Sequence, residues 1–158
     1  MKISLRELNE FDIENFLLWM KDESVLRLAI GNAEEFLEQD IKKCFSKMVN
    51  SKKDEHYAIL LSEKPIGLIS LIKDRENNHK MQLLIGDKGY WSKGYDMEAV
   101  KQMVEKIKER KDLQVYIEVR PDKTGSIAAF ANYGFVPTKN KKYPKDGHFP
   151  RALKMELS

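Results

Sequence analysis

The chain has 158 residues, 42% hydrophobic and 34% charged, a balance typical of a globular domain rather than a disordered chain. No apolar segment approaches the roughly 20 residues that cross a bilayer, which argues against a membrane partner. Its 28 basic and 25 acidic residues nearly balance, which disfavours a nucleic-acid partner, and its single cysteine excludes an intrachain disulfide. We therefore expect one domain over residues 1–158 and a cytoplasmic location.

The first half of the chain predicts one strand followed by two amphipathic helices. KISLREL alternates as a strand does, with Ile3 and Leu5 on one face. Residues 9–24 predict a helix whose apolar side chains form one stripe: Phe11, Phe16, Leu17 and Met20. Residues 33–50 predict a second helix, with Phe36, Ile41, Cys44, Phe45 and Met48 facing inward. Its place on that stripe makes Cys44 a small core residue rather than a nucleophile.

The second half alternates between strands and helices. Residues 56–61, 66–72 and 81–86 predict a three-stranded meander. A long helix follows, with Met97, Val100, Val104 and Ile107 on its apolar face, and then an alternating strand over 113–119. A short helix over 126–133 ends at Gly134, and 148–157 predict a closing strand. The long helix is a crossover that lets strands 81–86 and 113–119 run parallel, which predicts a mixed sheet and an α+β fold.

The segment DKGYWSKGYDMEAV (87–100) places two glycines and a lysine directly before the long helix. A helix N-terminus offers unpaired N–H groups and about half a positive charge, which suits a phosphate group. Gly94 removes a side chain where backbone approaches the phosphate, and Lys93 adds a cation. Asp96 opposes such a ligand, because its carboxylate competes for the N–H groups of the first turn as an N-cap.

Three segments carry a resemblance to one family. IGDKGYWSKGYDMEAV resembles the cofactor loop of the GNAT acetyltransferase superfamily, in particular the branch that acetylates ribosomal-protein N-termini and polyamines. SIAAFANYGF (126–135) and DGHFPRALKM (146–155) are similar to two later segments of the same family. The resemblance implies a single-domain GNAT-like fold: a mixed, mostly antiparallel sheet flanked by helices, with a splayed parallel strand pair. It also implies that the pantetheine arm of acetyl-CoA enters the gap between strands 81–86 and 113–119.

The resemblance also implies which residues contact acetyl-CoA: Leu83, Leu84, Ile85, Trp91, Ser92, Lys93, Gly94, Tyr95, Asp96, Lys123, Ser126 and Phe130. The chain departs from the family pattern at several of its functional positions. Asp96 stands where the family places a glycine or alanine, and Lys123 where it often carries an asparagine. Phe130 replaces the tyrosine that protonates the departing CoA thiolate, and Lys80 replaces a frequent catalytic glutamate. Two residues are candidates for the missing catalytic groups, Glu118 as base and Tyr133 as acid.

The function that the resemblance implies is an acetyl-CoA-dependent N-acetyltransferase acting on a primary amine of a small molecule or peptide. Two alternatives remain: a degenerate member that binds CoA or another ligand without efficient catalysis, and a binding module without any cofactor. A homodimer is possible. No segment has metal-ligand spacing, so no metal is expected. Each of the two charged candidates also has a purely structural interpretation. Glu118 would then be a solvated surface carboxylate, and Lys80 an exposed strand residue.

Overall fold

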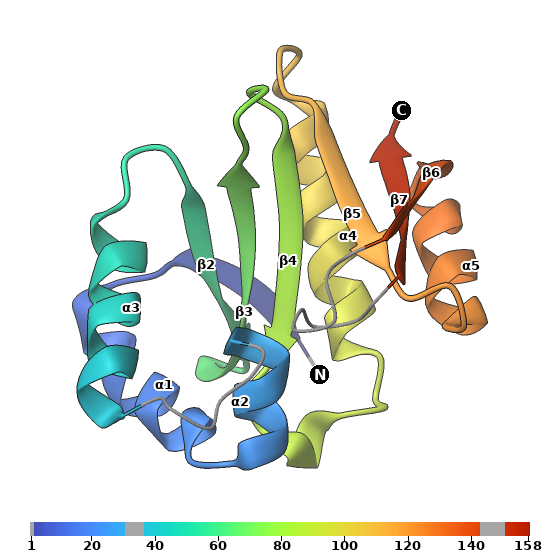
Figure 1. Cartoon of the computed structure of the whole chain (residues 1–158). Helices are drawn as coiled ribbons and strands as arrows, with labels where there is room; N and C mark the ends of the chain where they lie inside the picture. Colours follow the sequence, from blue (N-terminus) through green and yellow to red (C-terminus); the bar gives the residue numbers. More distant parts are fainter. Residues whose placement is uncertain (1, 31–36, 143–150) are drawn as a thin grey trace.

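The computed structural model describes residues 2–30, 37–142 and 151–158, and it folds around one central sheet (Figure 1). The strands are β1 (Ile3–Glu7), β2 (Glu55–Leu61), β3 (Lys64–Lys73), β4 (His79–Ile85), β5 (Val115–Val119), β6 (Phe135–Lys142) and β7 (Arg151–Leu157). The α-helices are α1 (Ile13–Met20), α2 (Glu23–Ile30), α3 (Glu38–Asn50), α4 (Tyr95–Lys108) and α5 (Thr124–Asn132), with short 3-10 turns η1 (Glu10–Asp12) and η2 (Lys88–Tyr90).

The seven strands lie in the order β1-β2-β3-β4-β5-β7-β6. Every neighbouring pair is antiparallel except β4 and β5, which are parallel because the α4 crossover joins them. This topology confirms the predicted α+β class and the predicted parallel pair.

Helices cover both faces of the sheet, and each face has its own core. On one face, α4 buries Ala99, Val100, Met103, Val104 and Ile107 against the strands, and α5 adds Phe130. On the other face, α1, α2 and α3 pack around Phe16, Trp19, Val25 and Phe45. Figure 1 shows α1–α3 gathered in front of the β2–β4 half of the sheet, with α4 behind it. The predicted apolar stripe of the long helix is thus confirmed.

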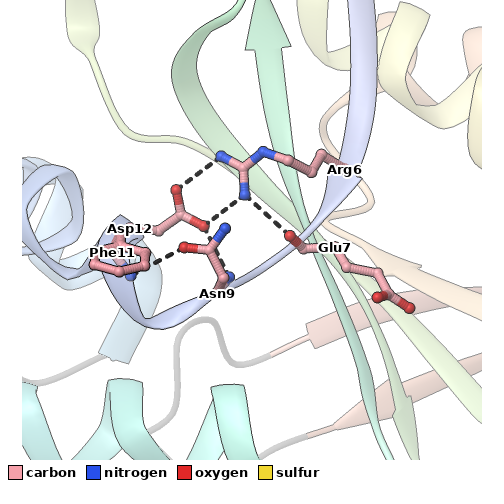
Figure 2. A network of polar contacts seen from close by, with 5 residues as sticks. All are labelled: Arg6, Glu7, Asn9, Phe11 and Asp12. Carbon is pink, nitrogen blue, oxygen red and sulfur yellow. Dashed lines mark hydrogen bonds and ion pairs between the residues drawn. The ribbon is translucent and has the colours of Figure 1, made fainter.

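The junction of β1 and α1 is held by an ion pair (Figure 2). Arg6 donates to both carboxylate oxygens of Asp12, at 3.0 and 2.9 Å. The same carboxylate accepts the Asn9 N–H at 2.9 Å, while the Asn9 side chain accepts the Phe11 N–H at 2.9 Å. This reciprocal capping box satisfies donors that a helix start leaves unpaired, and it fixes the angle at which α1 leaves β1.

We expect Asp12→Ala to lower the free energy of unfolding by about 1–3 kcal/mol at pH 7, because it leaves the Asn9 N–H without its partner and Arg6 with only the Glu7 carbonyl. Burial alone would raise the pKa of Asp12, but the bonds from Arg6 and Asn9 hold it below its ordinary 3.8. The carboxylate therefore stabilises fully above about pH 4, and this contribution is lost as pH falls through the lower folded pKa. Urea unfolding at pH 7 and pH 3 measures both effects.

The control is Asp122→Ala, which removes an exposed ion pair with Arg120 and is expected to cost less than about 1 kcal/mol at either pH. Equal losses in the two variants would show that the Arg6–Asp12 contact contributes nothing particular to stability.

The N-terminal helices differ from the prediction in three ways. The single helix expected over 9–24 is η1 followed by α1, and Phe11 is 80% exposed rather than inward-facing. The residues just after α1 form a separate helix, α2, because the Asp22 carboxylate accepts the Ser24 N–H and starts a new first turn. Helix α3 begins at Glu38, and predicted residues 33–36 lie outside the described residues.

The C-terminal region contains one strand that the sequence pattern does not predict. β6 pairs antiparallel with β7 and forms an edge of the sheet. The predicted closing strand is confirmed as β7, while its first residues, 148–150, lie outside the described part of the chain. The predicted short helix is confirmed as α5, and Gly134 follows it with a φ of +100°, a conformation that favours glycine.

Candidate active site

The candidate site lies where the sheet splits between β4 and β5. The two strands pair only at His79–Val115 and Lys80–Tyr116, near the start of each strand. Beyond these pairs they diverge toward the end of the sheet at which α4 begins, as Figure 1 shows. A parallel pair that opens in this way exposes the backbone of both strands to a ligand. The splayed pair that the resemblance implied is present.

The edge of β4 that faces the split offers backbone hydrogen-bonding groups. His79 donates its N–H across to Gln114 at 2.8 Å, so alternation along the strand turns the backbone of Met81 and Leu83 to the same edge. Farther along, the Ile85 carbonyl accepts the Trp91 indole N–H at 2.8 Å. Trp91 therefore joins the end of β4 to the loop before α4.

A cavity of about 830 Å³ passes through this region and reaches both faces of the sheet. Its lining includes Phe16, Met48 and Leu68 from the α1–α3 side, and Met97, Val100 and Phe130 from the α4–α5 side. This volume falls within the roughly 300–1,000 Å³ typical of small-molecule sites. The cavity is therefore large enough for a ligand that crosses the sheet through the split.

The loop before α4 contains two residues in the left-handed backbone conformation. Ser92 and Gly94 have φ values of +61° and +82°, and Gly94 is the N-cap of α4. A Cβ added at Gly94 would meet nothing within 4 Å, so the glycine serves the backbone conformation rather than close packing. The expectation that Asp96 is the N-cap is wrong in position, but its carboxylate does accept the N–H of Met97, in the first turn, at 2.9 Å.

The structure brings only part of the predicted cofactor-contact set into the large cavity. The members that line it are Leu83, Leu84, Asp96, Lys123, Ser126 and Phe130. Lys93, Gly94 and Tyr95 line a second, more open hollow together with Lys2. Ile85, Trp91 and Ser92 line neither, although Trp91 packs against both cores. The predicted set thus surrounds the split and the start of α4.

Glu118 lies on β5, opposite the diverging part of β4, and its side chain is only 3% exposed. Its Oε1 is 2.6 Å from Lys80 Nζ, and its Oε2 is 3.5 Å from Lys141 Nζ. The interpretation of Glu118 as a solvated surface carboxylate is therefore wrong, and so is that of Lys80 as a merely exposed strand residue. Both line the cavity, and their ion pair spans the two strands where they part.

Tyr133 is the C-cap residue of α5 and packs against the core on the α4–α5 face of the sheet. It is not among the residues that line the cavity, whereas Phe130 is. Phe130 is 8% exposed and makes an edge contact with Phe135, with ring centroids 5.7 Å apart. The expected packing of Phe130 between α5 and the sheet is confirmed, and the structure does not bring Tyr133 to the split.

The cavity floor carries a polar row that the sequence analysis did not identify. His56, Ser70 and Gln82 are direct cross-strand neighbours on β2, β3 and β4, and all three line the cavity. His56 Nδ1 lies 2.6 Å from Ser70 Oγ. Burial lowers the pKa of His56, an effect that Asp54 only partly offsets, so the imidazole is neutral near pH 7. The row offers hydrogen bonds to a polar ligand up to the edge of the split.

Cys44 also lines this cavity from α3 and is half-buried rather than fully in the core. Burial raises the pKa of its thiol, which Lys47 only partly opposes, so the thiol stays protonated near pH 7.

These features define a class of fold, an α+β domain in which a split parallel strand pair and a helix N-terminus face one cavity. The chain belongs to the GNAT acetyltransferase family, since the family model described as "Acetyltransferase (GNAT) domain" matches residues 2–136. The resemblance noted from the sequence is thereby confirmed, as is the predicted class of enzyme. No curated protein sequence matches the chain.

Several solved structures share the fold at low sequence identity. The spermidine N-acetyltransferase from Vibrio cholerae in complex with CoA and spermine has a TM-score of 0.78 at 13% identity, covering 98% of this chain and 94% of that one. The aminoglycoside acetyltransferase AAC(6')-Ib in complex with coenzyme A and kanamycin has a TM-score of 0.77 at 14% identity, covering 99% of this chain and 95% of that one. An uncharacterized protein from Bacillus halodurans has a TM-score of 0.78 at 19% identity, covering 98% of this chain and 83% of that one.

Among the residues that the structure describes, no group of three or more His, Cys, Asp or Glu side chains is placed to hold a metal ion. No helix among them is both long and apolar enough to span a bilayer.

Proposed function

We propose that the protein is an acetyl-CoA-dependent N-acetyltransferase that moves an acetyl group to the primary amine of a small molecule or peptide. The observation that carries the proposal is the split between β4 and β5, which opens into a cavity in a chain of the GNAT family. The related fold of two CoA-bound N-acetyltransferases supports the same use of this split.

In this proposal the pantetheine arm lies along β4 and the pyrophosphate lies at the start of α4. The backbone of Met81 and Leu83 pairs with the pantetheine amides, since these groups face the split. Lys93 and the N–H groups after Gly94 hold the pyrophosphate. Lys123, Ser126 and Phe130 form the opposite wall of the cavity, at and after the start of α5.

The acceptor amine approaches from the α1–α3 side, over the polar row of His56, Ser70 and Gln82. Glu118 takes the proton of its ammonium, directly or through a water. The neutral nitrogen then forms a bond to the acetyl carbonyl carbon, the carbon–sulfur bond breaks, and CoA leaves as a thiolate that takes up a proton. Backbone N–H groups of β4 polarise the carbonyl as charge develops on its oxygen.

Thermal-shift titration with acetyl-CoA, followed by thiol-release assays with a panel of primary amines, tests the proposal. A ligand at a hundred times its Kd stabilises a protein by about 2.7 kcal/mol, which is readily measured. Stabilisation together with thiol release by at least one amine supports it. Stabilisation without release favours the degenerate alternative, for which Asp96, Lys80 and Phe130 give specific grounds. No stabilisation rules out the enzyme and any CoA-binding degenerate form, and leaves a protein that binds another ligand or no cofactor.

Asp96→Gly and Asp96→Asn are both expected to tighten acetyl-CoA binding about fivefold or more. A carboxylate about 5 Å from a phosphate costs roughly 1–3 kcal/mol at effective dielectrics between 80 and 20. The asparagine variant is the sharper test, because its side-chain oxygen can still accept the Met97 N–H that Asp96 binds now. Calorimetric affinity that is unchanged or weaker in both variants would contradict this account of Asp96.

Lys93→Ala gives the complementary measurement. Lys93 is exposed, so its contact with a phosphate is expected to contribute only about 1 kcal/mol to binding. Calorimetry at low and high salt should show a weaker and less salt-dependent affinity than in the wild type. An unchanged affinity would make Lys93 a solvated surface residue.

A further inference from the structure

The ammonium group of Lys80 lies where an acceptor amine is needed. Lys80 forms the last paired position of β4 with β5, directly before the strands diverge. Its Nζ reaches across to Glu118 Oε1 on the opposite strand, 2.6 Å away. The side chain lines the cavity and is 31% exposed, so it remains open to a ligand there. The split therefore already holds a primary amine beside a buried carboxylate.

Two other lysines approach Glu118 or its neighbour Tyr116, but neither shares this position. Lys141 Nζ is 3.5 Å from Glu118 Oε2, and Lys154 Nζ lies 4.4 Å from the centroid of the Tyr116 ring. Both come from β6 and β7, on the far side of β5 from the split, and neither lines the cavity. Among the lysines around Glu118, the geometry singles out Lys80.

We propose that the protein acetylates its own Lys80 when acetyl-CoA occupies the split, a step that rests on the proposed function. Glu118 takes a proton from the Lys80 ammonium, and the neutral Nζ forms a bond to the acetyl carbonyl carbon. As the amide forms, Nζ loses a second proton. The carbon–sulfur bond breaks, and its electron pair leaves with CoA as a thiolate, which takes up this second proton, while Glu118 passes the first to water. The products are CoA, an uncharged Nε-acetyl-Lys80 and one proton, so no further reactant is required.

The four-carbon stem of lysine makes this transfer sterically reasonable. Nζ only has to turn from the Glu118 carboxylate to a thioester held against the same edge of β4. Acetylation removes the positive charge of Lys80, and Glu118 then keeps the Lys141 ammonium as a partner at 3.5 Å. The buried carboxylate is thus not left without a counter-charge, which would otherwise oppose the reaction strongly.

The test incubates the full chain with acetyl-CoA that carries a deuterated acetyl group and measures label at each lysine by peptide mass spectrometry. The isotope separates new acetylation from any present after expression. Lys42 and Lys101, both exposed on helices, report the background rate of uncatalysed acetylation in the same sample. Parallel samples contain excess CoA as a competitor, or protein at a tenth of the concentration.

We expect Lys80 to gain label at least about tenfold faster than Lys42 and Lys101, at a rate per chain that dilution does not change. Excess CoA should reduce labelling at Lys80 to background. Lys80→Arg keeps a cation beside Glu118 but should reduce the labelling of the whole chain to the background rate. Lys141→Arg should leave the fast labelling of Lys80 unchanged. Glu118→Gln is expected to slow labelling of Lys80 about 10²-fold, the usual effect of losing a positioned base.

Equal labelling rates at Lys80, Lys42 and Lys101 would overturn the proposal. Labelling of the whole chain that stays fast in Lys80→Arg would overturn it as well. Thermal shift with acetyl-CoA on the same samples separates this failure from that of the proposed function. If acetyl-CoA stabilises the protein while Lys80 stays at background, the self-acetylation is wrong and the acetyltransferase proposal stands. If acetyl-CoA gives no stabilisation, both are wrong.

Discussion

Glu118→Gln is expected to lower the turnover of amine acetylation by a factor of about 10²–10⁴, the range typical for loss of a positioned base. The glutamine fills the same space, but its one carbonyl oxygen can face only one of the two lysines that now pair with Glu118, and it cannot take up a proton. Acetyl-CoA binding should change little, because the cofactor contacts proposed here lie on β4, α4 and α5. The measurement is kcat and KM by thiol release, with thermal shift to confirm that the variant is folded and binds acetyl-CoA.

Glu156→Gln is the matched control for this change. Glu156 lies on β7, pairs with Lys154 at 3.5 Å and is 50% exposed, so its replacement alters a similar ion pair outside the cavity. Its turnover should stay within about twofold of the wild type, since exposed pairs contribute little. A Glu118→Gln enzyme with full kcat would contradict the role of Glu118 as proton acceptor. A loss confined to KM would make it a residue that only binds the amine.

The parts of the fold that depend on one strong periodic pattern could be predicted from the sequence. Val100, Val104 and Ile107 are each 3% exposed or less, because they form one stripe of a four-turn helix. A crossover helix of this length also allows the two strands that it joins to run parallel, and β4 and β5 do so. These predictions need only local pattern and chain connectivity.

Strand β6 and helix α2 were not predicted, because their local sequence patterns are typical of other structures. β6 contains Pro137 and ends in Lys139, Asn140, Lys141 and Lys142, a composition typical of a loop. An edge strand tolerates both features, because one side of its backbone needs no partner, and its register is interrupted between Pro137 and Lys139. Helix α2 has eight residues and follows α1 closely, so the break at Asp22 gives little signal.

The candidate site could be located from the sequence but not assembled. GYWSKGY predicts a turn before the long helix because glycine spacing is local information, and Ser92 and Gly94 in this turn adopt positive φ. The pairing of Lys80 with Glu118 joins residues on different strands, and the cavity floor requires the exact register of three strands. Only the folded sheet brings such groups together, so the buried state of Glu118 was not predictable from its alternating strand.

Phe130→Tyr is expected to raise turnover about tenfold to a hundredfold, because it places a phenol in the cavity wall where the chain now has a phenyl ring. A phenol with a pKa of about 10 can protonate a departing thiolate, and a positioned acid typically contributes 10² or more. The wild type should still turn over slowly, because a CoA thiol resembles a cysteine thiol with a pKa of about 8.5, a tolerable leaving group near neutrality. The measurement is kcat at pH 7 with the best amine of the panel.

Tyr133→Phe decides whether another phenol already supplies this acid. Tyr133 lies one turn beyond Phe130 but outside the cavity lining, so it can reach the thiolate only through water. We therefore expect its replacement to change kcat less than about twofold. A loss of tenfold or more would instead assign the acid to Tyr133. If Phe130→Tyr also gave no gain, proton donation would not limit the rate, and the thiolate would leave unassisted. Inactivity of both wild type and Phe130→Tyr towards every amine, with acetyl-CoA still bound, would establish a binding protein that has kept the GNAT fold.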